Sequence, residues 1–145
     1  VGGVIKRRTD FLARYGGEEL VALLPNTDAA SAMPIAQAVV QAVRDLALPH
    51  SASEAAAIVT LSVGVATVMP DMPPAPEVGT RLLADADAAL YMAKHQGRNR
   101  AVNRIPLDAT RLESTECKLN TELQYLPTPQ GLHMPTASVA TVASA

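Results

Sequence analysis

The chain has 145 residues, of which 48% are hydrophobic, so it can form one domain with its own core. A net charge of −2 and the absence of a long basic run argue against general nucleic-acid binding. Cys117 is the only cysteine, which excludes an internal disulfide and gives no indication of a zinc site. No apolar run reaches the roughly 18 residues that a membrane-spanning helix needs.

Residues 1–10 are interpreted as the end of a helix or as a connection, and they lack the pattern of a signal peptide. The first residue is Val1 rather than Met, so we expect the sequence to be a piece of a longer protein.

A predicted β-hairpin follows, with apolar runs at residues 11–13 and 20–24 on either side of a polar tip. Gly16 and Gly17 are predicted to form its two-residue turn, because glycine readily adopts the positive φ angles that such a turn requires. Their bare backbone would also let a phosphate approach closely.

Two carboxylates come directly after the glycines. Glu18 and Glu19 are predicted to start the second strand, where neighbouring side chains point to opposite faces. Only one of them can therefore face a given bound ion. Charged residues also follow the turns of ordinary solvated hairpins, so this motif alone leaves both interpretations open.

A first helix is predicted after the hairpin, with Thr27 as its N-cap. Pro34 is expected to kink or restart it, because a proline inside a helix removes a hydrogen bond and costs on the order of 3 kcal/mol. The apolar stripe predicted to face the core consists of Ile35, Val39, Val43 and Leu46.

The clearest strand is predicted over residues 58–68, which are β-branched and alternating. Residues 70–76 contain four prolines and are predicted to be a loop. A second helix is predicted over 79–96, ended by Gly97, and a short last strand over 100–105. The side chains of this helix expected to face the core are Leu83, Ala86, Leu90 and Ala93.

From residue 106 to residue 145 the periodicity stops, and no charged residue follows Glu122. Such a segment buries too little to offset its ordering entropy, so we expect it to be mostly disordered, with a frayed helix near 108–124. The remaining residues, 1–105, are predicted to form one α+β domain, an antiparallel sheet with packed helices.

Three segments together resemble one known family. Residues 14–20 (Arg-Tyr-Gly-Gly-Glu-Glu-Leu), 60–66 (Thr-Leu-Ser-Val-Gly-Val-Ala) and 86–99, which end in Lys-His-Gln-Gly-Arg-Asn, resemble the GGDEF family of diguanylate cyclases in order and spacing. Leu20 stands where the family usually has Phe. The resemblance covers about residues 4 to 104 and implies the palm-like, ferredoxin-related domain of nucleotide cyclases, without its first strand and helix.

The resemblance implies a chemistry as well. Diguanylate cyclases of bacterial signalling join two GTP molecules into cyclic di-GMP and release two pyrophosphates. Each protomer of a homodimer binds one GTP, and the two face each other. The step is an in-line attack of a 3′-hydroxyl on an α-phosphorus, assisted by Mg²⁺ or Mn²⁺.

The matching positions receive roles by the same resemblance. Glu18 stands in the metal-ligand and catalytic position, and Glu19 is a second catalytic candidate or a structural carboxylate. Gly16 and Gly17 stand where backbone meets the nucleotide. The two phosphate-binding cations correspond to Lys94 and Arg98, although cations at the end of a helix also offset its dipole by roughly 0.3–1 kcal/mol.

Arg7 and Asp10 match the Arg-x-x-Asp site at which the family binds its product, cyclic di-GMP. A partner Arg is often supplied by the next helix, but residues 36–38 contain none, so weak product inhibition is expected. The histidines His50, His95 and His133 show no metal-like spacing and are interpreted as ordinary surface or loop residues.

The family's first strand carries a second metal-binding Asp, and the following helix and loop read guanine. This chain does not include a match for them, so we expect the fragment alone to be inactive and the sheet to expose an unpaired edge. The parent protein is expected to be an active cytoplasmic cyclase, which an upstream segment could anchor to a membrane. One alternative is a catalytically inactive GGDEF domain that acts as a cyclic di-GMP receptor; another is a dimerisation module. The intact Gly-Gly-Glu-Glu core favours the cyclase.

Overall fold

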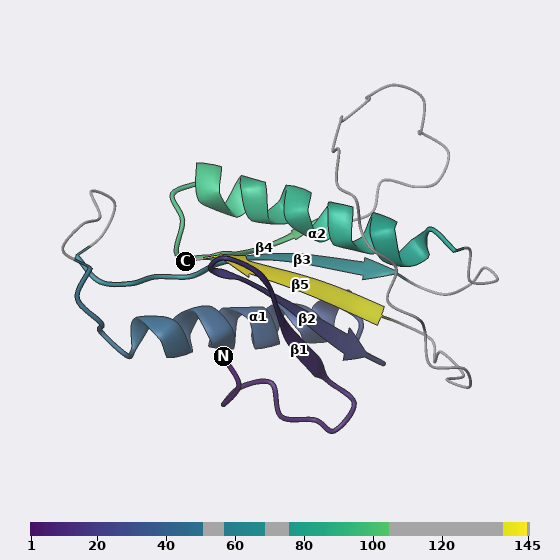
Figure 1. Cartoon of the computed structure of the whole chain (residues 1–145), viewed down its shortest axis with the longest axis horizontal. Coiled ribbons are helices and arrows are strands. Elements are labelled where there is room, and N and C mark those ends of the chain that lie inside the picture. The colour runs from purple at the N-terminus through teal and green to yellow at the C-terminus, as the bar shows by residue number, and fades with distance from the viewer. Residues whose placement is uncertain (51–56, 69–75, 105–137, 145) are drawn as a thin grey trace.

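A computed structural model of the chain describes residues 1–50, 57–68, 76–104 and 138–144. The elements form three layers, with a central five-stranded sheet, helix α1 on one face and helix α2 on the other (Figure 1). The predicted α+β fold is confirmed. In chain order the elements are β1 (Phe11–Gly16), β2 (Glu19–Pro25), α1 (Ala29–Arg44), β3 (Ser62–Val68), α2 (Val78–His95), β4 (Ala101–Arg104) and β5 (Ser138–Ser144).

The strands follow the order β1-β2-β5-β3-β4 across the sheet. The predicted hairpin pair β1–β2 is antiparallel, and so are the pairs β2–β5 and β5–β3. The β3–β4 pair is parallel instead. This follows from α2, which leads the chain back along the sheet before β4 begins, so that β4 runs in the same direction as β3.

Strand β5 corrects the expectation of an unpaired edge in the sheet, and it is a regular strand within a tail that was expected to be mostly disordered. It lies in the middle of the sheet, between β2 and β3. Its residues, Ser-Val-Ala-Thr-Val-Ala-Ser, contain no proline and no charge, and three of the seven are β-branched, which suits a strand. The rest of the tail, including the frayed helix expected near 108–124, lies outside the described residues.

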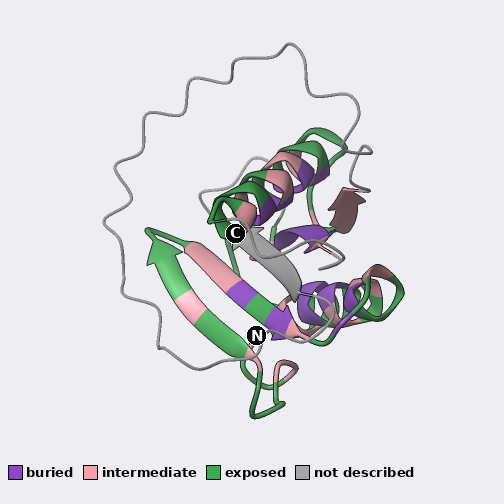
Figure 2. Ribbon diagram, turned by 90° about the vertical axis from the view of Figure 1, so that its right-hand side faces the viewer, coloured by how far each residue is buried: buried purple, intermediate pink, exposed green. Residues whose placement is uncertain are grey.

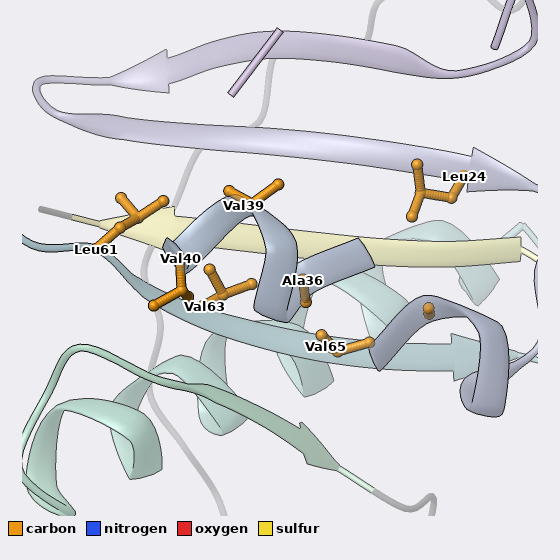
Figure 3. Close-up of a cluster of buried hydrophobic side chains, with 8 residues drawn as sticks. Leu24, Ala36, Val39, Val40, Leu61, Val63 and Val65 are labelled. Carbon is orange, nitrogen blue, oxygen red and sulfur yellow. The ribbon is translucent and has the colours of Figure 1, made fainter. Parts of the chain in front are cut away.

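Alternation along β3 divides the core between the two faces of the sheet. Val63 and Val65 belong to the cluster beneath α1, whereas Ala66 belongs to the cluster beneath α2 (Figure 3). Gly64, on the α2 side, allows the helix to approach the strand closely: a Cβ atom there would lie 2.1 Å from the backbone oxygen of Ala86. Figure 2 shows that the buried residues of both helices line the sheet, whereas the outer strand β1 is largely exposed.

Helix α1 differs from its prediction in three respects. Its N-cap is Asp28, whose carboxylate accepts a hydrogen bond from the Ser31 backbone N–H at 2.7 Å; hydrogen bonding to Ser31 lowers the pKa of that carboxyl. The helix also continues through Pro34 without a break. Of the predicted stripe, Val39 is buried and Ile35 and Val43 are partly buried against the core cluster, but Leu46 lies beyond the helix and is 61% exposed. The buried residues are Ala32, Ala36, Val39 and Val40.

Helix α2 and strand β3 lie close to their predictions. The helix occupies residues 78–95, and Gly97 ends it with a φ of +108°. Leu82, rather than the neighbouring Leu83, is the leucine most fully buried at its start. The regular part of the predicted strand is Ser62–Val68, and Ile58 forms only an isolated bridge with Pro49. The loop expected at residues 70–76 falls largely outside the described residues.

Candidate functional site

The hairpin turn is formed by Gly17 and Glu18, one residue later than predicted. Gly16 still belongs to β1 and pairs with Glu19, because an irregularity in the strand between Arg14 and Gly16 shifts the register. Gly17 has a φ of +46°, the left-handed conformation that the turn requires. Glu18 therefore lies exposed in the loop itself, and strand alternation does not fix its direction.

The turn is held from within the hairpin by Arg14. Its Nε donates a hydrogen bond of 2.8 Å to the carbonyl oxygen of Gly17, and Nη2 donates a second one to the same oxygen. A Cβ atom added to either Gly16 or Gly17 would meet nothing within 4 Å. The hydrogen bonds from Arg14 fix the backbone of the turn, and the space around its glycines lets a ligand reach it. Sequence reasoning did not assign this role to Arg14.

Lys94 and Arg98 line one open hollow at the C-terminal end of α2, together with Tyr91 and His95. Arg98 adopts a φ of +56° in the turn that follows Gly97. The rings of Tyr91 and His95 are tilted against each other with centroids 4.1 Å apart. His95, predicted to be an ordinary surface residue, thus forms part of the wall, and its i,i+4 spacing from Tyr91 could have indicated this.

The register of the sheet relates the hairpin turn to this hollow. Leu20 lies opposite Ala143, Ala143 opposite Val63, and Val63 opposite Ala101. The turn directly before β2 and the turn directly before β4 are therefore at the same end of the sheet (Figure 1). Three strand spacings of about 4.8 Å separate them, roughly 14 Å, so a ligand that touches both must be extended.

Glu19 has a defined face, unlike Glu18. It opens β2 and is half-buried, two residues before Val21, which packs against the cluster beneath α2. Because alternate residues of a strand share a face, Glu19 lies on the α2 side of the sheet, as do the residues of the hollow. Leu20 lies on the other side and packs against the cluster beneath α1.

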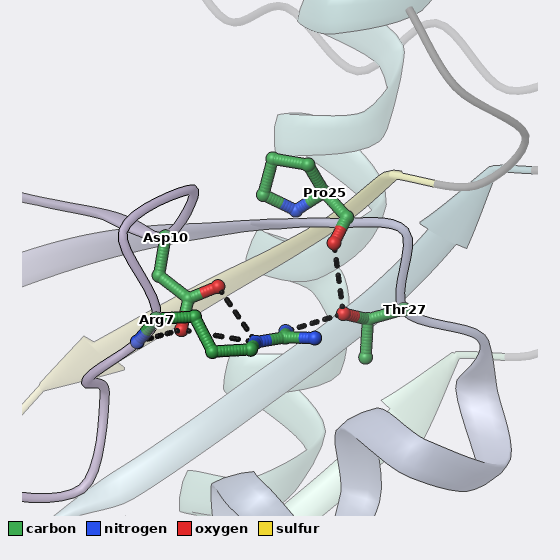
Figure 4. Close-up of polar contacts among 4 residues, drawn as sticks. All are labelled: Arg7, Asp10, Pro25 and Thr27. Atoms are coloured by element: carbon green, nitrogen blue, oxygen red, sulfur yellow. Dashed lines mark hydrogen bonds and ion pairs between the residues drawn. The ribbon is translucent and has the colours of Figure 1, made fainter.

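Arg7 and Asp10 are in direct contact. The Nε of Arg7 lies 3.0 Å from Asp10 Oδ1, and the backbone N–H of Arg7 donates to Oδ2 at 3.2 Å. Arg7 Nη2 also donates to Thr27 Oγ1 at 2.6 Å, and that hydroxyl donates to the carbonyl oxygen of Pro25 at 3.2 Å (Figure 4). Thr27, predicted to be the helix cap, is instead buried, and its hydrogen bond with Arg7 holds that side chain at the junction between β2 and α1.

This ion pair lies far from the hairpin turn. Asp10 directly precedes β1, and Thr27 follows the end of β2, so both are at the opposite end of the hairpin from Glu18. The seven residues of β2 separate the two places by about 20 Å. The side chain of Asp10 is only 4% exposed, whereas that of Arg7 is 47% exposed. Arg7 and Asp10 therefore lie apart from the residues of the hairpin turn, in keeping with their prediction as a separate product-binding site.

The carboxylates at the hairpin are candidate ligands for a divalent cation. Among the described residues, no group of three His, Cys, Asp or Glu side chains is placed to hold a metal ion. Glu18 and Glu19 can offer at most two carboxylates. Mg²⁺ is commonly held by one or two carboxylates together with water and substrate phosphates, so the hairpin supplies only part of such a site. In the part of the chain that the structure describes, no helix is long and apolar enough to cross a membrane.

Residues 4–100 match the protein family described as "Diguanylate cyclase, GGDEF domain". The chain belongs to the GGDEF family. The resemblance to this family is thereby confirmed.

Several curated proteins are similar to this chain. Diguanylate cyclase A of Treponema denticola is 36% identical over 103 residues, which cover 69% of this chain and 26% of that protein. Probable diguanylate cyclase DgcC of Escherichia coli K12 is 36% identical over 94 residues, covering 65% and 24%. Response regulator PleD of Caulobacter vibrioides is 35% identical over 100 residues, covering 68% and 21%. The chain thus spans about a quarter of the length of these relatives.

Proposed function

We propose that the protein to which this chain belongs is a diguanylate cyclase that condenses two GTP molecules into cyclic di-GMP and two pyrophosphates for bacterial signalling. One observation supports this most strongly: an open glycine turn bearing Glu18 stands at the same end of the sheet as the hollow lined by Lys94 and Arg98. A carboxylate, a bare backbone and two cations are the groups that a triphosphate and its metal ion require.

Each residue receives a role in this proposal. Glu18 binds Mg²⁺ or Mn²⁺, and the open backbone of Gly16 and Gly17 receives the nucleotide. Lys94 and Arg98 bind the phosphates from across the end of the sheet. The metal ion, when bound, neutralises phosphate charge and helps to activate the attacking hydroxyl. Glu19, on the α2 face, is either a second catalytic carboxylate or a structural one.

The remaining assignments follow from the reaction. The described residues of one chain contain one such hairpin site, whereas the reaction joins two GTP molecules. We therefore assign catalysis to a homodimer in which each protomer binds one GTP. Because GTP is the substrate, we place the domain in the cytoplasm. Residues 1–105 are assigned to the GGDEF domain, and β5 completes its sheet from the segment beyond.

The proposal is tested with the full-length parent and with the 145-residue chain, each incubated with GTP and Mg²⁺ and assayed for cyclic di-GMP. We expect product from the parent and none from the chain, because two hairpin carboxylates alone leave the metal ion poorly held. A parent that forms no product contradicts the cyclase function. A chain that works at the parent's rate contradicts the requirement for further carboxylates.

A second activity is favoured by the contact between Arg7 and Asp10, namely binding of cyclic di-GMP as an inhibitor or, in an inactive domain, as a signal. The buried carboxylate and half-exposed guanidinium are already held together. The guanidinium can bind a phosphate or the guanine edge, and the carboxylate can accept a hydrogen bond from a guanine amine. If the domain is a receptor instead of a cyclase, it should bind cyclic di-GMP at this site without turning over GTP. If it is a dimerisation module, it should form dimers without turning over GTP.

Replacing Arg7 by Ala should weaken cyclic di-GMP binding by about tenfold or more, since a hydrogen-bonded charged contact contributes about 1.5–3 kcal/mol. Calorimetry on the parent and on the Arg7→Ala variant measures the effect. Arg8→Ala is the matched control, because Arg8 is an exposed neighbour of the same charge. Equal affinity in the parent and in Arg7→Ala would return Arg7 and Asp10 to a purely structural role.

A further inference from the structure

Among the described residues, the backbone pairing that joins the two halves of the sheet runs only through β5. In the described residues, β2 and β3 do not pair with each other; β5 pairs with β2 from Leu20 to Pro25 and with β3 from Ser62 to Val68. Without β5, a hairpin (β1 and β2) and a parallel pair (β3 and β4) would each present an open strand edge. An open edge of unpaired N–H and C=O groups is a template for another strand.

The connection to β5 also differs from the other connections in the sheet. The strands of the β1–β2 pair are joined by a two-residue turn, and those of the β3–β4 pair by α2. Strand β5 is reached from β4 only through residues 105–137. At about 3.3 Å per extended residue, a connection of this length can reach far beyond the width of the sheet. Connectivity therefore does not restrict β5 to the sheet of its own chain.

The occupant of this position is defined by its backbone pairing and its sequence. Residues 138–144 pair antiparallel with both neighbours, so backbone hydrogen bonds hold the segment on both sides, as they hold a strand inserted into a sheet. The segment has no proline to interrupt the hydrogen-bond ladder and no charge to oppose insertion into the centre of a sheet. Its two valines and one threonine favour extended backbone.

We propose that the gap between β2 and β3 is a strand-acceptor site, and that residues 138–144 are its exchangeable occupant. The site binds an antiparallel strand of this sequence whether that strand comes from the same chain, from a second copy or from a free peptide. Occupation joins the two halves of the sheet. It also sets which residues stand beside the Glu18 turn, since the end of β5 lies next to Leu20.

A proline in β5 tests the proposal. Val142 lies opposite Val21 on one side and opposite Gly64 on the other. Val142→Pro in the 145-residue chain removes a backbone N–H from the middle of the sheet and should expel the segment. Hydrogen exchange at the amides of β2 and β3 should then accelerate at least tenfold. The control is Val142→Thr, which keeps the N–H and the β-branched shape and should leave exchange near the parent level.

A labelled synthetic peptide of residues 136–145 provides the second measurement, by fluorescence anisotropy. It should bind the Val142→Pro chain and restore slow exchange in β2 and β3, including where that chain alone has lost its fold. The same peptide with proline at position 142 should not bind. A strand-swapped dimer of the unaltered chain at high concentration also supports the proposal. Unchanged exchange in Val142→Pro, or no binding of the unaltered peptide to that chain, overturns it.

Discussion

Replacing Glu18 by Gln in the full-length parent should lower the conversion of GTP to cyclic di-GMP by at least about a hundredfold. Glutamine has nearly the shape of glutamate but no charge, and a neutral amide is a poor ligand for Mg²⁺ compared with a carboxylate. Because Glu18 is exposed in the hairpin turn, the substitution removes no packing contact, and the melting temperature should not change. The rate loss would therefore reflect the site rather than the fold.

The matched control is Glu77→Gln. Glu77 is also exposed, but it stands at the N-terminal end of α2, at the end of the sheet opposite to the Glu18 turn, and its side chain makes no capping hydrogen bond. It should keep the parental rate. A titration with Mn²⁺ adds a second readout, since a weakened metal site needs more metal for half-maximal activity. Parental turnover by the Glu18→Gln protein would contradict the role of Glu18 and, with it, the proposed arrangement of the site.

Local patterns in the sequence predicted most of the elements but not their detailed registers. The alternation of residues 58–68 and the spacing of Leu90 and Ala93 reflect the faces that β3 and α2 bury. The predicted hairpin turn was one residue too early, because the strand irregularity near Tyr15 depends on how two strands pair. The sequence of one segment alone does not reveal that pairing. Thr27 and Asp28 are both good caps, and only the contact with Arg7 shows why Thr27 is used otherwise.

Strand β5 could not be predicted from the local sequence. Judged as one composition, residues 106–145 bury too little to fold, and that judgement overlooked seven residues that need only two neighbouring strand edges. Those edges belong to β2 and β3, which are far away in sequence, so their availability cannot be read from the tail.

The candidate site was predictable where family motifs define it and incomplete elsewhere. The glycine turn, its carboxylates and the two cations were named from the sequence, and the structure brings the turn and the cations to one end of the sheet. The supporting residues Arg14 and Tyr91 were not named. Each acts through a contact with another side chain or a carbonyl group, and a one-dimensional pattern does not specify such contacts.

Replacing Gly64 by Ala should destabilise the domain strongly, with a free energy of unfolding lower by about 3 kcal/mol. The added Cβ would lie 2.1 Å from the backbone oxygen of Ala86 and 2.3 Å from the backbone nitrogen of Leu90. Both atoms belong to the backbone of α2, so no side-chain rotation can relieve the overlap. The helix must move away from β3 and loosen the cluster that contains Ala66, Ala86 and Leu90.

Gly79→Ala is the control for this prediction, because it is the same substitution in the helix that Gly64 contacts. Gly79 lies in the first turn of α2, and a Cβ added there would meet nothing within 4 Å. Alanine at such a helical position should be neutral or stabilising by up to about 1 kcal/mol. Thermal unfolding followed by circular dichroism should give a melting temperature at least about 10 °C lower for Gly64→Ala than for Gly79→Ala. Equal melting temperatures would show that α2 does not pack on β3 as closely as the structure places it.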